Sequence, residues 1–299
     1  MQHPDLTAVI PAYNCRTFIA ETIRTVAKAG PAYILVADDA STDDTAEAAE
    51  RALAQLDCET RLMRNERNLG VTGNWQSAIK QVATPYCWKC DADDLVHPNY
   101  IFDAMTLLQS SEDVAIVAAQ PKRIGGGAVV PDRASEAFSQ LVWQPPPPQI
   151  LRGLDAARFL LHWDNVASAT TIYRMSAWRA VGGFDLRIGY CSDHEIWFRL
   201  AKVAAIAFFP AVGAIYRVNP HGVTRTALSK STVAWDRGNM YLKAQRLWPD
   251  RELHQLFRKQ LRIIFKAHLG SARRRLRTNH MDAWGNITRA ITLIPKIVF

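Results

Sequence analysis

The chain has 299 residues, of which 48% are hydrophobic, so it is long enough for one large core or two fused lobes. No apolar run approaches the roughly 20 residues that span a bilayer, and the N-terminus lacks a signal-peptide pattern, so we expect a cytoplasmic protein. The net charge of +8 arises from residues 235–299, which hold 14 Lys or Arg and 4 Asp or Glu. The rest of the chain holds 22 Lys or Arg and 24 Asp or Glu, and this asymmetry argues against a nucleic-acid-binding body.

Short apolar strands alternate with helices in the first third of the chain. Strands are predicted at residues 6–10, 33–37, 61–64 and 86–90, and helices at 17–29, 45–56 and 74–82. This alternation is typical of an α/β fold with a mostly parallel sheet and helices on both faces. Ligands of such sheets bind at the carboxyl ends of the strands. The polar residues just past the strands should therefore converge there: Asp38, Asp39, Asn68, Asp91, Asp93 and Asp94.

The pattern becomes less regular after residue 110. Glycines at 125–127 and prolines at 145–148 indicate a turn and an extended connection, which is a candidate boundary between two lobes. Further elements are predicted beyond it: a strand at 169–173 and helices at 176–180 and 196–203.

Two helix starts have the spacing of a capping box, in which two side chains satisfy the free backbone N–H groups of the first turn. Ser41 and Asp44 precede the helix predicted at 45–56, and Ser192 and Glu195 precede the one at 196–203. Both pairs are therefore predicted to cap a helix.

The strand at 86–90 ends in an acidic turn that holds Asp91, Asp93 and Asp94. Neighbouring carboxylates raise one another's pKa and repel, so such a cluster favours a bound divalent cation over a solvated turn. Oxygen ligands alone point to Mg²⁺ or Mn²⁺ carrying phosphates. Which of the three acids contacts the ion is left open.

Four segments, in this order along the chain, resemble signatures of the family 2 glycosyltransferases. They are Val9–Asn14 (VIPAYN), Val36–Asp43 (VADDASTD), Asp91–Asp94 (DADD), and Gly183–Asp185 followed by Ser192–Leu200 (GFD … SDHEIWFRL). The resemblance covers about residues 6–225 and implies a GT-A fold, which is Rossmann-like. The division expected is a GT-A domain at 1–231, with a nucleotide-binding part at 1–120 and an acceptor-binding part at 145–231, and a basic helical segment at 232–299.

The resemblance also implies which residues bind the nucleotide-diphosphate sugar. Asp39 would accept a hydrogen bond from the base, the Tyr13 ring would pack near it, and Arg217 would pair with phosphate. Asn74 is equally suited to cap its helix, and a role for Asp38 is left open. The full implied set is Pro11, Ala12, Tyr13, Asn14, Asp39, Asn68, Gly70, Asn74, Asp91 and Arg217.

For the metal, the resemblance implies Asp93 or Asp94 as ligand, with Asp91 on the ribose or a metal-bound water. His221 is a further candidate contact to the metal or diphosphate. The alternative is that His221 is a loop histidine with no special role.

Asp193 matches the family's catalytic base, and its place in a first helical turn should favour its ionised form and slightly lower its basicity. A purely structural Asp193 at the helix start is the alternative, with Glu195 as the fallback base. We expect His194 at the surface or rim, and Trp197 and Arg199 to pack the helix.

Apolar residues after Pro249 follow helical spacing, with Arg and Lys on the other faces. Such a helix either packs on the catalytic lobe or lies on an anionic membrane, and the apolar end at 291–299 raises the second possibility. The residues with this spacing are Leu253, Leu256, Phe257, Leu261, Ile264, Phe265 and His268.

The sequence thus predicts an inverting, metal-dependent glycosyltransferase that uses a nucleotide-diphosphate sugar, with UDP favoured as the nucleotide. The expected acceptor is a glycan or a lipid-linked glycan of surface polysaccharide or lipopolysaccharide synthesis. A catalytically silent sugar-nucleotide-binding protein and a sugar nucleotidyltransferase are the alternatives, although the latter normally has a Gly-rich phosphate loop where Pro11–Asn14 stands.

Overall fold

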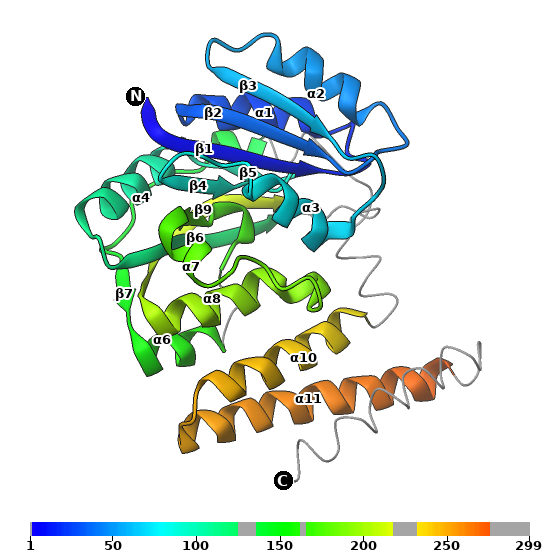
Figure 1. Ribbon diagram of the computed structural model, residues 1–299, viewed down its shortest axis with the longest axis vertical. Helices are drawn as coiled ribbons and strands as arrows, with labels where there is room; N and C mark the ends of the chain where they lie inside the picture. The colour runs from blue at the N-terminus through cyan, green and yellow to red at the C-terminus, as the bar shows by residue number, and fades with distance from the viewer. Residues whose placement is uncertain (1, 125–135, 162–165, 218–231, 276–299) are drawn as a thin grey trace.

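A nine-stranded mixed sheet organises the protein, as seen in a computed structural model that describes residues 2–124, 136–161, 166–217 and 232–275 (Figure 1). Its strands are β1 (His3–Ala12), β2 (Pro31–Asp38), β3 (Glu59–Arg64), β4 (Tyr86–Lys89), β5 (Leu95–Val96), β6 (Val114–Ile124), β7 (Gln149–Leu151), β8 (Ile172–Arg174) and β9 (Ala205–Arg217). The strand order is β3-β2-β1-β4-β8-β6-β9-β5, and β7 pairs with β9.

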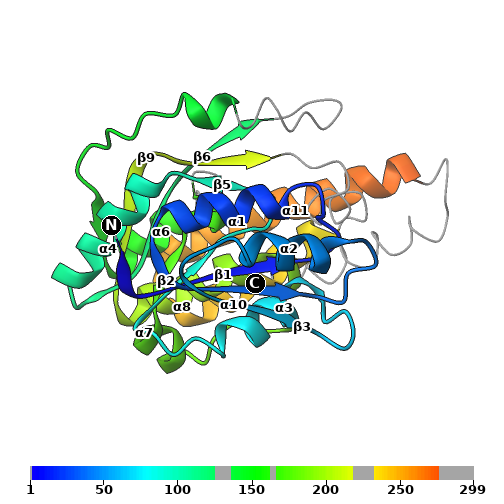
Figure 2. The same cartoon turned by 90° about the horizontal axis from the view of Figure 1, so that it is seen from above.

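The N-terminal half of the sheet is parallel, as predicted, because β1 pairs in parallel with β2 and β4, and β2 with β3. The other half is mixed. β8 runs antiparallel between β4 and β6, and β5 and β7 run antiparallel to β9. The long strands β6 and β9 lie side by side in parallel (Figure 2). The expectation of a mostly parallel sheet therefore holds for one half only.

Helices cover both faces of this sheet. They are α1 (Ile19–Lys28), α2 (Thr45–Leu53), α3 (Gly70–Ile79), α4 (Pro98–Ser110), α6 (Gly153–Leu160), α7 (Met175–Ala180), α8 (Ser192–Val203), α10 (Thr232–Leu247) and α11 (Arg251–Arg275). One core cluster joins α1, α2 and α4 to the sheet, and a second joins α3, α6, α7 and α8 to it. α1 contributes Ile19, Ile23 and Val26, whose spacing of four and three residues places them on one face.

Both predicted capping boxes are wrong. The Ser41 hydroxyl accepts a hydrogen bond from Asn14 N at 2.9 Å, and Asp44 makes no side-chain cap at the start of α2. α8 begins at Ser192 itself, whose hydroxyl lies 3.0 Å from that of Thr72. Contacts between distant segments thus engage the side chains that local spacing assigned to caps.

The C-terminal helices extend the second core cluster outward. α10 packs on α8, and α11 forms the outermost layer beside α10 (Figure 1). The Phe257 ring lies 5.6 Å from that of Phe198 in α8 and 5.9 Å from that of Tyr241 in α10. The predicted alternative in which this helix packs on the catalytic lobe is therefore the one observed. Within the described residues, none of the helices combines the length and apolar character needed to cross a bilayer.

Replacing Phe257 by Ala should lower the free energy of unfolding by about 3–5 kcal/mol, because it removes a fully buried ring from the shared cluster. Ile263→Ala on the same helix is the matched control, since Ile263 is 53% exposed, and it should change stability by no more than about 0.5 kcal/mol. Urea denaturation of both variants measures the difference. Equal losses would mean that α11 does not pack as described.

Candidate active site

The ends of β1 and β2 form one wall of the candidate site. Asn14 follows β1 with φ of 48°, a left-handed conformation that Asn tolerates better than most residues. Its side-chain oxygen accepts a hydrogen bond from Thr42 N at 2.8 Å, which ties the two loops together. Pro11 and Ala12 are buried in β1, whereas Tyr13 is 40% exposed. Of this predicted group, Tyr13 therefore presents a ring at the surface.

Asp39 stands directly after β2 and is almost fully buried. Its Oδ1 accepts hydrogen bonds from Asn65 Nδ2 and Leu69 N, both at 2.8 Å. Asn74 joins the same network, because its Oδ1 accepts from Asn65 and its Nδ2 donates to the Ala37 carbonyl. The network fixes the orientation of the Asp39 carboxylate.

The helix predicted to begin at Asn74 begins four residues earlier, at Gly70, so Asn74 does not cap it. Gly70 has φ of 75°, which favours glycine. Its N–H donates to the side chain of the exposed Asn68 at 2.9 Å. Asp38, whose role the sequence left open, is buried and paired with Arg64 at 3.3 Å.

Lys89, the last residue of β4, belongs to the site although the sequence did not single it out. Its side chain is fully buried, with Nζ 2.5 Å from Asp91 Oδ1 and 3.9 Å from the centre of the Trp75 ring. A lysine inside an apolar strand, two residues before an acidic cluster, is the signal that could have identified it. Asp91 follows two residues after Lys89, the spacing at which side chains of an extended chain point to the same side.

The acidic turn after β4 is anchored to the end of β9. Asp94 is buried, and its Oδ1 accepts a hydrogen bond from Arg217 N at 3.1 Å. Burial, together with the charges of Asp93 and Asp91, raises the pKa of the Asp94 carboxyl well above its ordinary value. Asp93 is only partly buried, so it is the better placed of the two to meet a ligand.

Arg217 is the last residue of β9 and is almost fully buried. Its guanidinium pairs with Glu21 of α1, donates to the Asp93 carbonyl at 3.2 Å and lies 5.2 Å from the Phe18 ring centre. These contacts show that Arg217 braces the acidic turn against α1. The predicted His221 lies outside the described residues.

Asp193 is the second residue of α8 and is partly buried, with Oδ1 accepting from His194 N at 2.7 Å. Burial raises the pKa of its carboxyl above the ordinary 3.8, while the Lys89 charge acts in the opposite direction. The predicted slight loss of basicity is therefore wrong in direction, because desolvation outweighs the effect of the helix N-terminus. A raised pKa makes Asp193 a stronger base.

The neighbours of Asp193 on α8 are structural. Glu195 is buried and paired with Arg199 and with Lys243 of α10, each at 2.6 Å, which argues against it as a base. His194 is not at the rim, as predicted, but in the core, where its Nε2 lies 2.5 Å from the Leu160 carbonyl. Burial lowers the pKa of His194 to about 3, so the ring is neutral. Trp197 and Arg199 pack the helix, as expected.

The donor set can be tested against a divalent metal. Within the described ranges, no group of three or more His, Cys, Asp or Glu side chains is arranged to enclose an ion. Mg²⁺ and Mn²⁺ sites that carry phosphates need fewer protein ligands, because one or two carboxylates suffice and the phosphates and water complete the coordination shell. Asp93, with Asp91 nearby, fits this open type of site.

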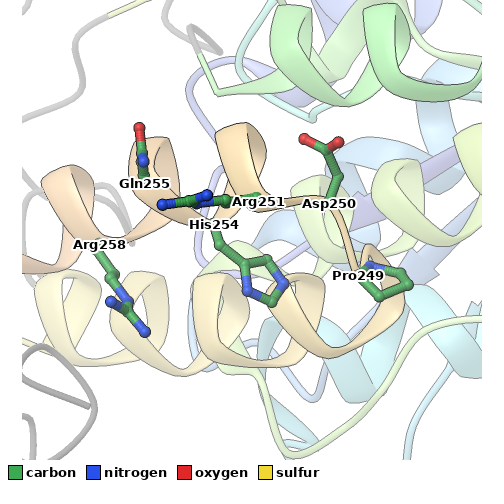
Figure 3. Close-up of a pocket in the computed structure, with 6 residues that line it drawn as sticks. All are labelled: Pro249, Asp250, Arg251, His254, Gln255 and Arg258. Atoms are coloured by element: carbon green, nitrogen blue, oxygen red, sulfur yellow. The ribbon is translucent and has the colours of Figure 1, made fainter.

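A separate hollow of about 490 Å³ lies at the turn between α10 and α11, lined by Pro249, Asp250, Arg251, His254, Gln255 and Arg258 (Figure 3). Asp250 Oδ1 accepts from Leu253 N at 2.8 Å, and His254 Nε2 lies 3.0 Å from the Gln245 carbonyl. This turn lies at the end of the molecule opposite the carboxyl ends of β1 and β2 (Figure 1). The hollow is therefore not part of the candidate site.

The chain is similar to several known glycosyltransferases. An uncharacterized glycosyltransferase of Haemophilus influenzae is 23% identical over 225 residues, 72% of this chain and 66% of its own length. The putative glycosyltransferase EpsE of Bacillus subtilis is 22% identical over 201 residues, and 66% of each chain is covered. The chain thus spans slightly less than two thirds of the length of these two relatives.

Solved structures share the GT-A fold. The mannosyltransferase PcManGT of Pyrobaculum calidifontis, in complex with GDP-Man and Mn²⁺, matches with a TM-score of 0.63 at 16% identity over 97% of this chain and 87% of its own. TarS of S. aureus, residues 1–349 with UDP, matches with a TM-score of 0.57 at 18% identity over 87% of this chain and 71% of its own. The model of glycosyl transferase family 2 matches residues 7–173, more than half of the chain, and the chain therefore belongs to that family.

Proposed function

We propose that this protein is an inverting glycosyltransferase that moves a sugar from a nucleotide-diphosphate sugar, with UDP-sugars favoured, to an acceptor hydroxyl. The observation that carries the proposal is that Asp39 and Asp91 follow parallel strands at the same edge of the sheet, with Asp193 close enough for the charges of Lys89 and Asp91 to act on it, in a chain of glycosyl transferase family 2. The GDP-Man in PcManGT and the UDP in TarS support a nucleotide-sugar donor.

The nucleotide would bind at the ends of β1 and β2. With Asp39 Oδ1 held by Asn65 and Leu69, the orientation of the carboxylate is set before the nucleotide arrives, and it would accept the N–H of a base such as uracil. The partly exposed Tyr13 ring would form a flat wall beside it. Asn14, Asn68, Gly70 and Asn74 would shape this pocket through the hydrogen bonds described above.

A divalent cation, Mg²⁺ or Mn²⁺, would neutralise the charge that builds on the leaving diphosphate. Asp93 would hold it, and Asp91 would contact the ribose or a metal-bound water. Asp94, the other predicted ligand, is buried against Arg217 N, so we assign it to the architecture of the turn.

Asp193 would act as the base. An acceptor hydroxyl that attacks the anomeric carbon opposite the diphosphate must lose its proton as the new bond forms, and a carboxylate with a raised pKa takes this proton better than an ordinary one. One such group is sufficient for a reaction that inverts the anomeric centre.

We further propose that the segment 232–299 forms a cytoplasmic, peripheral contact with a membrane that carries a lipid-linked acceptor. The apolar face of α11 is buried on α10 and α8, so the contact would be electrostatic rather than an insertion of this face. Lys259, Arg262 and Lys266 are exposed on α11 and supply the positive charge.

Asp193→Asn should reduce the rate of sugar transfer by about 10²–10⁴-fold, the usual contribution of a general base, while the donor still binds. The measurement pairs a transfer assay over a panel of nucleotide sugars with donor binding by thermal shift. Asp113→Asn is the control, because Asp113 is an exposed partner of Arg152 and should leave transfer unchanged. Donor binding without transfer by the unmodified protein would instead indicate a binding protein.

Removal of divalent ions with a chelator should abolish transfer, and Mg²⁺ or Mn²⁺ should restore it. Asp93→Asn should weaken the binding of UDP in the presence of Mn²⁺ by about tenfold or more, because the ligand charge is lost. Titration calorimetry with and without Mn²⁺ separates this effect from a general loss of binding. Binding of UDP that does not depend on Mn²⁺ in either protein would rule out the metal.

The full-length double variant Lys259→Glu/Arg262→Glu should bind anionic vesicles more weakly than the unmodified protein, with the loss greatest at low salt. Arg24→Glu/Lys28→Glu makes the same charge change on exposed residues of α1 and serves as the control. Vesicle flotation with anionic and neutral lipids measures both. Equal binding by the two variants would refute the proposed contact surface.

A further inference from the structure

Lys89 is a charged side chain with no access to solvent. An ammonium group in the interior is costly unless it is paired, and breaking such a pair leaves an uncompensated charge. Lys89 Nζ meets Asp91 Oδ1 at 2.5 Å and lies 3.9 Å from the Trp75 ring centre, where the ring adds a cation–π contact. The position of this charge is therefore tightly defined.

The charge acts on two of the carboxylates assigned above. It pairs directly with Asp91, and it also lowers the pKa of Asp193, against the effects of burial and of the Asp91 charge. Without Lys89, Asp91 and Asp193 would face each other's charge in a partly desolvated site. Because Lys89 is fully buried, it acts through these carboxylates and not on a substrate.

We propose that Lys89 is a positioning residue, whose ammonium orients Asp91 toward the donor and compensates the combined negative charge of Asp91 and Asp193. This inference rests on the proposed function, in which Asp91 contacts the donor and Asp193 is the base. It adds to the site a buried cation that contacts Asp91 and whose charge acts on Asp193.

Of the titratable groups near Asp193, Glu195 is already paired with Arg199 and Lys243, and Tyr173 and Cys191 stay neutral. Burial raises the pKa of the Tyr173 phenol on β8 well above its ordinary value, and burial raises that of the Cys191 thiol, just before α8, to about 12. Neither group ionises near neutral pH. Lys89 and Asp91, both at the end of β4, carry the charges that act most strongly on the Asp193 carboxyl, so their removal should move its titration.

The test is the pH dependence of kcat/KM for Lys89→Met in the full chain, with the donor and acceptor that the unmodified protein uses. The base must be ionised, so kcat/KM falls as pH drops through the Asp193 pKa. Loss of the Lys89 charge should move this acidic limb upward by about 1 pH unit, the usual effect of a nearby opposite charge. Lys89→Arg, which keeps the charge, should return the limb toward its original position.

Lys243→Met is the matched control, because Lys243 is also paired with two acids, the buried Glu195 and the partly buried Asp185, but is not among the main influences on Asp193. It should lower thermal stability and leave the limb in place. A folded Lys89→Met protein with an unmoved limb would overturn the inference. If this variant does not fold, Lys89→Met/Asp91→Asn replaces it, because it removes both charges of the pair. Its acidic limb should move by less than about 1 pH unit, since the opposite effects of Lys89 and Asp91 on the Asp193 carboxyl are lost together.

A binding measurement separates this inference from the proposed function. Lys89→Met should weaken UDP binding by about tenfold in calorimetry, because Asp91 loses its anchor, and this readout needs no turnover. Absence of transfer from every donor would refute the proposed function alone. Unchanged UDP affinity in a folded Lys89→Met protein would refute the role of Lys89 in orienting Asp91.

Discussion

The need to hold several carboxylates together at one edge of a sheet governs the rest of this structure. Burial and neighbouring like charges both raise the pKa of a carboxyl, and for Asp94 burial acts more strongly than the charges of Asp93 and Asp91. Two buried cations hold this region together: Lys89 pairs with Asp91, and Arg217 pairs with Glu21 and donates to the Asp93 carbonyl. The backbone N–H of Arg217 also donates to Asp94. Both cations come from strand ends, so the sheet itself sets the geometry of the site.

The C-terminal helices belong to this arrangement, although they lie beyond the residues that the family model matches. Lys243 of α10 pairs with Glu195 on α8 and with Asp185 in the turn before it. Asp236 of α10 accepts a hydrogen bond from Tyr190 N, one turn ahead of Asp193. Contacts from α10 thus fix the position of α8, the helix that carries the candidate base. These contacts give the C-terminal segment a structural role independent of any membrane.

Sequence patterns predicted the first four strands that carry the site and missed β6 and β9 in the second half. β9 contains Pro210 and Gly213, and β6 contains Pro121, residues that ordinarily interrupt strands. The pairing of these strands shifts register around Gln120, which is how the sheet accommodates them. The predicted caps failed for a related reason, since Ser41 and Ser192 bond to distant residues that spacing alone does not reveal.

The sequence by itself determined the α/β class, the family resemblance and the candidate residues Asp39, Asp91, Asp93 and Asp193, because strand-end motifs depend on short-range patterns. Only the tertiary structure decided what each group contacts. It paired Lys89 with Asp91, brought the Arg217 guanidinium to the Asp93 carbonyl of the acidic turn, and placed His194 in the core. Burial and charge pairing set the pKa of Asp193, and both depend on elements that are far apart in the chain and meet only in the fold.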